Sequence, residues 1–363
     1  MSASLGASPG SNGSAISIFG NIQYQERNFL GKGYATSLNF QITPNQSKNS
    51  NLSYSAGLSL SNPSIYDSLW GANLWGNFSH QLTQITNTND NSLKYLEQNI
   101  SSAGVGLGRE LTDDWRVNLN YSLAYYRNTP DSPLIQNFYQ NGKIEEFSQG
   151  LTYDKTNNYL NPTQGLYLSL NNSLGFQGLF GQYTYGRFSS TDAYYVPLNL
   201  GKYFNSNFKF TLKPQFVYQL KQDQPVPYFK RLTLGDSYYM KGYSNPGETI
   251  SPKISIMVNN TTKELVDMIT GGDRSFYGSL EYFVPIIAEA GLRFVTFGEA
   301  GSVLAQDESF SFDKFKYDVG FGIRWQTPIA PFRFEWAFPV DKDGVGSAHF
   351  IFSIGYDSFG SGG

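Results

Sequence analysis

The residue types that carry most enzyme and metal chemistry are scarce in this sequence. It contains no cysteine and only two histidines, His80 and His349, which excludes disulfides and thiolate metal sites and leaves little for imidazole chemistry. No nucleophile elbow, Ser-His-Asp order or phosphate-binding loop is recognisable, and the Asp and Asn clusters lack EF-hand spacing. We therefore expect no enzyme activity, no catalytic residue, no metal and no cofactor, and we expect both histidines to be ordinary interfacial or lumen residues.

Three charged residues remain as candidates for a functional site. Lys241 lies in a long polar connection, 221–274, and Glu281 and Glu299 lie in two later segments in which apolar and polar residues alternate. Alternation puts each glutamate on the polar face of its segment. The chemistry of these residues would be charge pairing inside a fold, so the elements that hold them decide what they can do.

The composition indicates what those elements are. Charged residues make up 15% of the chain, against roughly 25% in a typical soluble domain, and no apolar run approaches the ~18 residues of a membrane helix. A net charge of -3 without a basic cluster also excludes a nucleic-acid partner. Aromatic residues reach 16% although the mean hydropathy is -0.36. A membrane-spanning β-barrel has this profile, because its lipid-facing and lumen-facing residues alternate and cancel in the average.

Period-two alternation runs through the chain. It is clear in 115–126 and 314–325, where every second residue is large and apolar and the residues between are polar or glycine. Sixteen segments are predicted as strands: 2–8, 14–25, 33–43, 50–60, 69–80, 99–109, 115–127, 143–154, 165–176, 182–196, 207–220, 275–285, 291–301, 314–325, 331–339 and 347–359.

The connections separate a membrane barrel from a soluble sandwich, which also alternates. Compact turns such as 111–114 alternate with longer polar connections, including 81–98, 128–142 and 221–274, as the periplasmic turns and outer loops of outer-membrane barrels do. The sequence therefore predicts an all-β fold, a 16-stranded antiparallel transmembrane β-barrel with both termini on the periplasmic side. The barrel would be the single domain, over residues 1–359, followed by a flexible tail at 360–363. The start of the chain lacks the features of a secretory signal, so we expect a mature or trimmed form.

Several motifs, in order, resemble the superfamily of the outer-membrane protein assembly factor BamA and the two-partner secretion transporters. The Met240-Lys241-Gly242-Tyr243 run is similar to the Val-Arg-Gly-Phe/Tyr tip of that superfamily's sixth loop, with Lys in place of Arg. The other matching stretches are Asn28–Gly33, Asn62–Pro63, Tyr153–Asp154, Gly278–Pro285, Phe297–Gly301 and Gly320–Pro331. The resemblance covers nearly the whole chain and implies that the long sixth extracellular loop, 221–274, folds back into the barrel.

The resemblance also implies a latch that holds this loop, formed by Lys241, Gly242, Tyr243, Glu281 and Glu299. In the superfamily the cation of the tip pairs with acids on strands twelve and thirteen, which by position are Glu281 and Glu299. Two carboxylates facing a narrow lumen would repel each other, and an ammonium group between them would relieve that repulsion. Lysine lacks the bidentate fork of arginine, so a looser latch is expected. The alternative is that Lys241 is a solvated loop charge and both glutamates line the lumen with water.

The first and last predicted strands form the weakest junction. The first strand offers one sizeable apolar residue, Leu5, beside Gly6, and the last carries Gly355 after Phe352 and Ile354. Weak pairing at this lateral seam would let a client strand add to an exposed edge, which is the gate that the resemblance implies. The alternative is a frayed N-terminus.

The end of the chain resembles the C-terminal sorting signal of outer-membrane barrels. The residues concerned are Phe350, Phe352, Ile354, Tyr356 and Phe359.

The resemblance implies an insertase of the outer membrane, in a Gram-negative-type envelope or an organelle of that origin. Its partners would be outer-membrane lipids, unfolded β-barrel clients, and periplasmic POTRA domains or accessory lipoproteins. A polypeptide secretion pore, of the two-partner or patatin-type autotransporter kind, is the alternative on the same fold. A passive solute channel is a third hypothesis, and an inward-folded loop disfavours it.

Overall fold

Strands make up almost all of the regular structure. The computed structural model describes residues 2–9, 16–44, 52–87, 93–130, 140–158, 161–199, 205–236, 238–243, 250–259, 264–327, 331–341 and 344–354. Its strands are β1 (Ser2–Pro9), β2 (Ile16–Phe29), β3 (Tyr34–Pro44), β4 (Leu52–Asn62), β5 (Trp70–Asn87), β6 (Leu93–Glu110), β7 (Trp115–Pro130), β8 (Gly142–Asp154), β9 (Gly165–Gly175), β10 (Tyr185–Asn199), β11 (Asn205–Leu212), β12 (Gln215–Gln219), β13 (Lys253–Asn259), β14 (Glu264–Ile269), β15 (Arg274–Ile287), β16 (Leu292–Leu304), β17 (Lys316–Gln326), β18 (Pro331–Asp341), β19 (Gly344–Val345) and β20 (His349–Ile354).

The helical elements of the described chain are single turns of 3-10 helix. They are η1 (Ile65–Asp67), η2 (Tyr228–Lys230), η3 (Lys241–Tyr243) and η4 (Phe312–Lys314). None of the helices in these ranges has the length and apolar character needed to cross a membrane.

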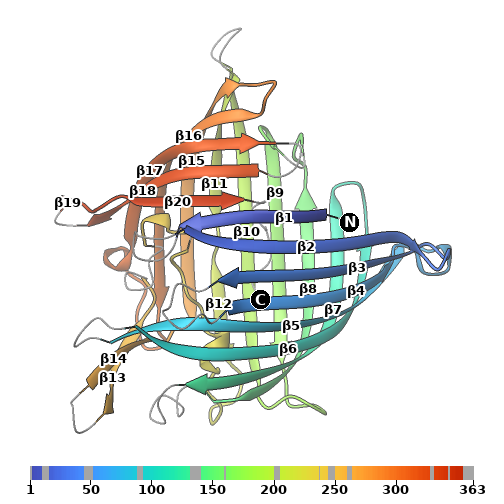
Figure 1. Ribbon diagram of the computed structural model, residues 1–363, viewed down its shortest axis with the longest axis horizontal. Coiled ribbons are helices and arrows are strands. Elements are labelled where there is room, and N and C mark those ends of the chain that lie inside the picture. Colours follow the sequence, from blue (N-terminus) through green and yellow to red (C-terminus); the bar gives the residue numbers. More distant parts are fainter. Residues whose placement is uncertain are drawn as a thin grey trace.

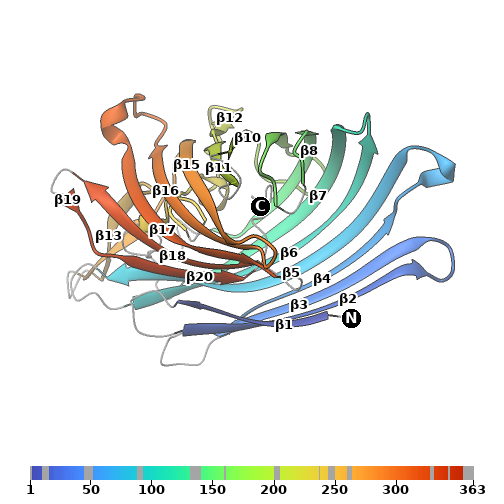
Figure 2. The same ribbon diagram turned by 90° about the horizontal axis from the view of Figure 1, so that it is seen from above.

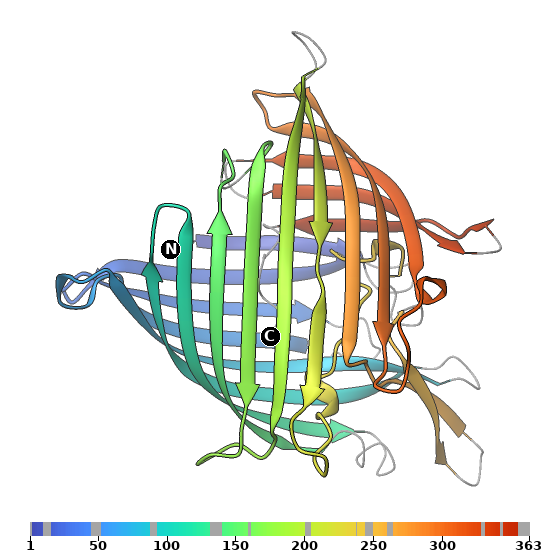
Figure 3. The ribbon, with the colours of Figure 1, turned by 180° about the vertical axis from the view of Figure 1, so that it is seen from behind.

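Antiparallel pairing joins the strands in chain order. The ladder runs from β1 to β10, continues through β11 and β12 to β15, and then passes through β16, β17 and β18 to β20. The sheet curls on itself, so that β20 lies beside β1 (Figures 1 and 2). Seen from behind, the strands from β7 to β15 cross β1 to β5 at a steep angle (Figure 3). The all-β fold class and the large antiparallel sheet are thus confirmed.

Each predicted strand segment overlaps a strand of this sheet, but the structure differs from the prediction at several places. The segment 207–220 contains both β11 and β12, which flank Lys213 and Pro214 and keep one register against β10. The structure also has β13, β14 and β19, which the alternation analysis did not predict. The number sixteen for the barrel strands therefore stays a prediction.

The predicted connection 81–98 is wrong. β5 and β6 remain paired through most of it, from Gln81 with Gln98 to Thr86 with Leu93. The alternation of apolar and polar residues stops there, because the part of a strand that extends beyond the lipid does not need apolar side chains at every second position.

A second departure lies inside the long connection 221–274, where β13 and β14 form a hairpin. β14 pairs with β5 at Thr86 and Asn87, on the edge that β4 leaves uncovered after His80. The long connection is therefore tied to the sheet by backbone pairing as well as by side chains.

The two faces of the sheet differ as alternation requires. Cross-strand register places Lys209, Glu281 and Glu299 on the inner face, while large apolar residues project from the outer face. Exposed members of the outer face include Tyr24, Leu38, Phe40, Leu58, Phe78, Val105, Tyr194, Phe210, Leu280, Phe321, Trp336 and Phe350. An apolar belt around a polar interior is the arrangement of a barrel that sits in lipid.

The end of the sheet holds part of the predicted sorting signal. Phe350 and Phe352 lie on the outer face of β20, with ring centroids 5.0 Å from Trp336 and 4.9 Å from Phe334. The backbone of Ile354 pairs with Phe332. Gly355, Tyr356 and Phe359 lie outside the described residues. The sorting role itself stays a prediction.

The Asn28–Gly33 motif forms the tight turn between β2 and β3. The Asn28 side chain accepts a hydrogen bond of 2.8 Å from the Gly33 backbone N–H, and Gly31 and Gly33 have φ angles of 68° and 74°. Glycine adopts such angles without the steric cost that a Cβ brings. The spacing of asparagine and glycines in this motif thus follows from the geometry of the turn.

Candidate functional site

The long connection between β12 and β15 is anchored first at its base. Leu232 and Gly272 exchange two backbone hydrogen bonds of 2.8 Å, which brings its two ends together. The Phe229 ring stacks on Tyr126 at 4.3 Å, and Lys230 forms an ion pair of 3.4 Å with Glu146 of β8. The connection, yellow in Figure 2, begins inside the curl of the sheet. These contacts hold the first part of the loop against the inner face.

A turn centred on Asp236 then directs the chain towards the tip. The Asp236 carboxylate accepts hydrogen bonds of 2.7 Å from the backbone N–H groups of Tyr238 and Tyr239. Burial raises the pKa of the Asp236 carboxyl, and these two donors oppose that effect. Met240 follows with a φ of 55°, an uncommon angle for a residue other than glycine.

Apolar contacts seat the tip on the sheet. Leu234, Met240 and Tyr243 form a buried cluster with Tyr277 of β15 and Val303 of β16. Met240 is completely buried. Burial of this kind stabilises the strained backbone at Met240, since such angles persist only where their surroundings enforce them.

Lys241 and Glu299 meet in the interior. The Lys241 ammonium forms an ion pair with Glu299, and the Lys241 backbone N–H donates to the same carboxylate at 2.8 Å. Tyr277 donates from its hydroxyl to Glu299 at 2.6 Å. The ammonium also lies 4.0 Å from the centroid of the Phe297 ring. Lys241 is 1% exposed and Glu299 3%, so the pair is shielded from water and each partner depends on the other.

Gly242 makes the closest approach of the tip to the wall. Its N–H donates to Asp318 of β17 at 2.8 Å. A Cβ at Gly242 would lie 2.8 Å from the Asp318 Cβ and 2.9 Å from the backbone nitrogen of Pro339. The adjacent Tyr243 hydroxyl donates to the Tyr317 carbonyl at 3.2 Å. Only glycine fits here without movement of the wall.

Replacing Gly242 with alanine should therefore displace the tip. The added methyl group meets strand backbone at Pro339, and overpacking of this kind costs about 1–3 kcal/mol. We expect a lower midpoint of thermal unfolding in detergent and faster protease cleavage of the loop. Gly298→Ala is the matched control, because nothing lies within 4 Å of a Cβ at Gly298. Equal unfolding midpoints for the two variants would contradict the close fit.

Glu281 does not join Lys241, contrary to the sequence prediction. Its carboxylate pairs with Arg324 of β17 and, at 3.3 Å, with Lys209 of β11. Lys209 lies directly opposite Glu281 in the register. On the other side Glu281 is opposite Phe297, so it lies one inner-face position beyond Glu299. The structure therefore brings Lys241 together with Glu299 and not with Glu281, and the latch role of these residues stays a prediction.

Glu281 belongs instead to a chain of alternating charges in the wall. Arg324 donates from Nε to Glu335 of β18 at 2.6 Å, and Arg333 donates to the second oxygen of Glu335 at 3.0 Å. The chain therefore runs from Lys209 through Glu281, Arg324 and Glu335 to Arg333. The Arg333 guanidinium lies 5.2 Å from the centroid of the Tyr238 ring, which brings the wall network into contact with the loop.

Sequence reasoning missed Asp318 and most of this network. The signal for Arg333 and Glu335 was present, because both fall on the polar face of their alternating segment. The pairing of Glu335 with Arg324 of β17, and of Arg324 with Glu281 of β15, depends on register, which the sequence did not supply. Among the described residues, no group of three or more His, Asp or Glu side chains is placed to hold a metal ion.

The predicted lateral seam lies between β1 and β20. β1 pairs with β2 along its whole length, with Leu5 opposite Gly20 and Gly6 opposite Phe19. β20 pairs with β18. The two strands lie side by side (Figures 1 and 2), yet no ladder pairing joins them within Ser2–Pro9 and His349–Ile354. The tip of the loop, η3, also lies next to β20. The functional roles of the latch and the seam stay predictions.

Comparisons with known proteins agree with this architecture. A family model described as "Omp85 superfamily domain" matches residues 28–357. The outer membrane protein assembly factor BamA of Nitratidesulfovibrio vulgaris is 33% identical over 134 residues, which cover 36% of this chain and 16% of that protein.

Two solved structures share the fold. BamA from Haemophilus ducreyi lacking POTRA domains 1-3 superposes with a TM-score of 0.70 at 20% identity, covering 97% of this chain and 69% of that chain. CdiB from Acinetobacter baumannii gives a TM-score of 0.65 at 14% identity, covering 96% and 58%.

Proposed function

The chain belongs to the Omp85 superfamily, and from this we propose that it assembles β-barrel proteins into the outer membrane through the seam between β1 and β20. Members of the superfamily are integral outer-membrane β-barrels, so the outer membrane is its location. The curated relative is itself named an outer membrane protein assembly factor, which supports assembly as the function.

The observation that supports the proposal is the junction of β1 and β20, where the described residues 2–9 and 349–354 form no ladder with each other. A strand edge without a ladder presents backbone N–H and C=O groups that another strand can bind. A client strand would exchange hydrogen bonds with water for hydrogen bonds with such an edge, so the step needs no nucleotide. Unfolded β-barrel proteins are the clients, and POTRA domains or accessory lipoproteins are the proposed further partners.

A reversible cross-link tests the seam. Because the chain has no cysteine, Leu5→Cys combined with Ile354→Cys introduces one possible disulfide between the two strands. We expect oxidation to abolish assembly of a urea-denatured client barrel into liposomes that contain the protein, and reduction to restore it. The shift of the folded client on an unheated gel measures assembly.

The control cross-link joins two strands that are already paired. Leu38 and Leu58 lie opposite each other in β3 and β4, so cysteines there should leave assembly unchanged. Full activity of the oxidised seam variant would contradict a lateral gate.

The alternative on the same fold is a polypeptide secretion pore, which the fold shared with CdiB favours. A secreted chain would pass through the lumen, so loop six would have to leave it. A cross-linked seam would then remain active, whereas a loop tied to the wall would block transport. The two functions therefore predict opposite results for the same oxidised variant.

A further inference from the structure

A polar row crosses the outer face of the wall near the side of the long connections. Tyr54, His80, Asn99 and Arg127 are successive partners in the register of β4, β5, β6 and β7. The Tyr54 and His80 rings stack at 5.0 Å, and His80 hydrogen-bonds Asn99 at 2.9 Å. On a face that is mostly apolar, a row of aromatic and polar residues indicates the level of lipid headgroups.

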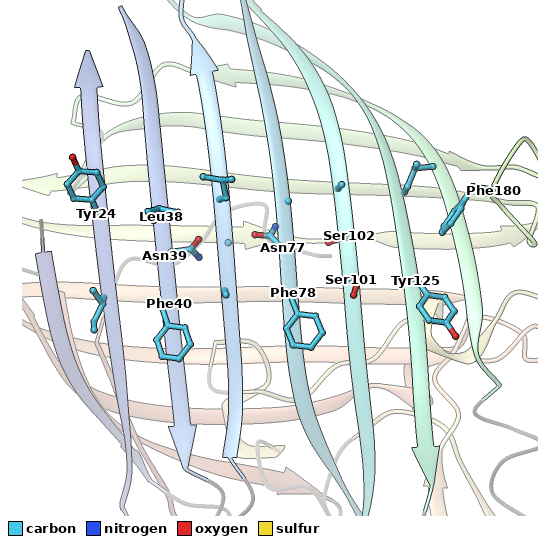
Figure 4. A pocket seen from close by; sticks show the side chains of 17 residues that line it. Tyr24, Leu38, Asn39, Phe40, Asn77, Phe78, Ser101, Ser102, Tyr125 and Phe180 are labelled. Atoms are coloured by element: carbon cyan, nitrogen blue, oxygen red, sulfur yellow. The ribbon is translucent and has the colours of Figure 1, made fainter. Parts of the chain in front are cut away.

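An apolar groove of about 900 Å³ lies next to this row, on the side towards the membrane centre. Its floor consists of small residues, Ala56, Gly76, Ser101 and Ala103. Bulky rings flank them, and Figure 4 shows Phe40, Phe78 and Tyr125 side by side at one level of the wall. Ala56 and Ser101 lie between these rings in one row of the register. Gly76 and Ala103 lie opposite each other in the next row, so the small residues leave an apolar hollow among bulky side chains.

A loop that folds over the outer face ends the groove. Glu145 of β8 projects outward, where a bare carboxylate in lipid would be costly. The loop 176–184 covers it, with the N–H groups of Phe180 and Gly181 donating at 2.9 Å and 3.0 Å and the Tyr121 hydroxyl at 2.7 Å. These bonds hold the backbone at Phe180, whose side chain lines the groove near Tyr125 (Figure 4).

Two cations stand at the mouth of the groove. Arg127 is exposed in the polar row, and Lys143, also exposed, is opposite Tyr125 in the register. The Lys143 ammonium lies 5.4 Å from the centroid of the Phe180 ring. Of the acids on this face, Glu145 is occupied by its four donors, including Gly178, and Glu97 lies two residues beyond Asn99, away from the groove. The mouth of the groove therefore favours an anion.

We propose that this groove binds a lipid of the outer leaflet, with an acyl chain over the small residues and a phosphate of the headgroup against Arg127 and Lys143. The apolar lining matches the chain, and the two cations match a phosphate at the level where headgroups lie. The site lies on the outer face, away from the latch, and it requires only that the barrel sits in the outer membrane.

Native mass spectrometry of the detergent-solubilised protein tests the proposal. The probes are lipid A with its phosphates and the same lipid A after their removal. We expect the phosphorylated form to bind more tightly, and Arg127→Gln and Lys143→Gln each to weaken it about fivefold, as about 1 kcal/mol for each cation at a charged lipid surface predicts. Ala103→Phe, which fills the groove, should weaken both forms alike.

The control is Lys32→Gln, which removes an exposed cation from the turn at the opposite end of the wall. Unchanged binding by the Arg127→Gln, Lys143→Gln double variant would overturn the proposal. An equal loss in Lys32→Gln would do so as well, because it would reduce the interaction to general charge attraction. Heat-modified mobility on gels shows that each variant is folded.

Discussion

Replacing Glu299 with alanine is expected to release the tip of loop six from the wall. The change leaves three buried donors without their acceptor, namely the Lys241 ammonium, the Lys241 backbone N–H and the Tyr277 hydroxyl. Removing one partner of a buried ion pair typically costs 3–5 kcal/mol. Because the tip belongs to a loop, it can escape part of this cost by leaving the interior, so we expect about 3 kcal/mol and a displaced loop.

Two measurements follow the loop directly. Protease cleavage within residues 221–274 should accelerate. Ion conductance in planar bilayers should rise above that of the unmodified protein, because a displaced tip no longer occupies the interior of the sheet. Glu299→Asp keeps the charge, so its cleavage rate and its conductance should lie between those of the unmodified protein and those of Glu299→Ala. Glu289→Ala, in the exposed turn between β15 and β16, is the control for loss of a carboxylate. A closed, protease-resistant Glu299→Ala variant would show that Lys241 does not hold the loop.

A double-mutant cycle separates the ion pair from the fold. If Lys241 and Glu299 act together, Lys241→Met should lower the free energy of unfolding much less in the Glu299→Ala background than in the unmodified protein. Additive effects would mean that the two residues stabilise the barrel independently. Lys241→Arg should retain the latch, since arginine keeps the charge and adds a bidentate geometry.

The positions of the strands could be predicted because lipid imposes a strict rule on them. A strand that crosses the membrane must present apolar side chains at every second position, as 314–325 does around β17. The rule ends where the lipid ends. Gln81 and Gln98 pair beyond the row of His80 and Asn99, where the apolar alternation has stopped, so the sequence there resembles a loop.

The candidate site could be predicted only in part, because a motif names residues and not their register. Lys241 and Glu299 were found from the resemblance of the tip and of strand thirteen. The partner of Glu281 is set by β11, which places Lys209 directly opposite it. Asp318 was missed because the sequence does not show which inner-face acid a returning loop will touch. Contacts between segments far apart in the chain depend on register, and period two alone does not determine it.

Replacing Glu335 is expected to cause the second large loss of stability, in the strands of the wall rather than in the loop. Its carboxylate is completely buried and accepts from Arg324 at 2.6 Å and from Arg333 at 3.0 Å. Glu335→Leu removes this buried acceptor from both Arg324 and Arg333. We expect a loss of about 3–5 kcal/mol, measured as the free energy of unfolding in detergent. Strands cannot leave the wall as a loop can, so no escape reduces this cost.

An exposed pair of the same chemistry provides the control. Arg116 and Glu110 lie 3.2 Å apart with side chains 48% and 74% exposed, and such pairs contribute about 0–1 kcal/mol. Glu110→Leu should therefore change stability little. Glu335→Leu should also leave ion conductance low, because Lys241 and Glu299 remain paired, whereas Glu299→Ala should raise it. If both variants raised the conductance equally, the charged network of the wall and the Lys241–Glu299 pair would act as one cooperative unit. Our inference that they act separately would then be wrong.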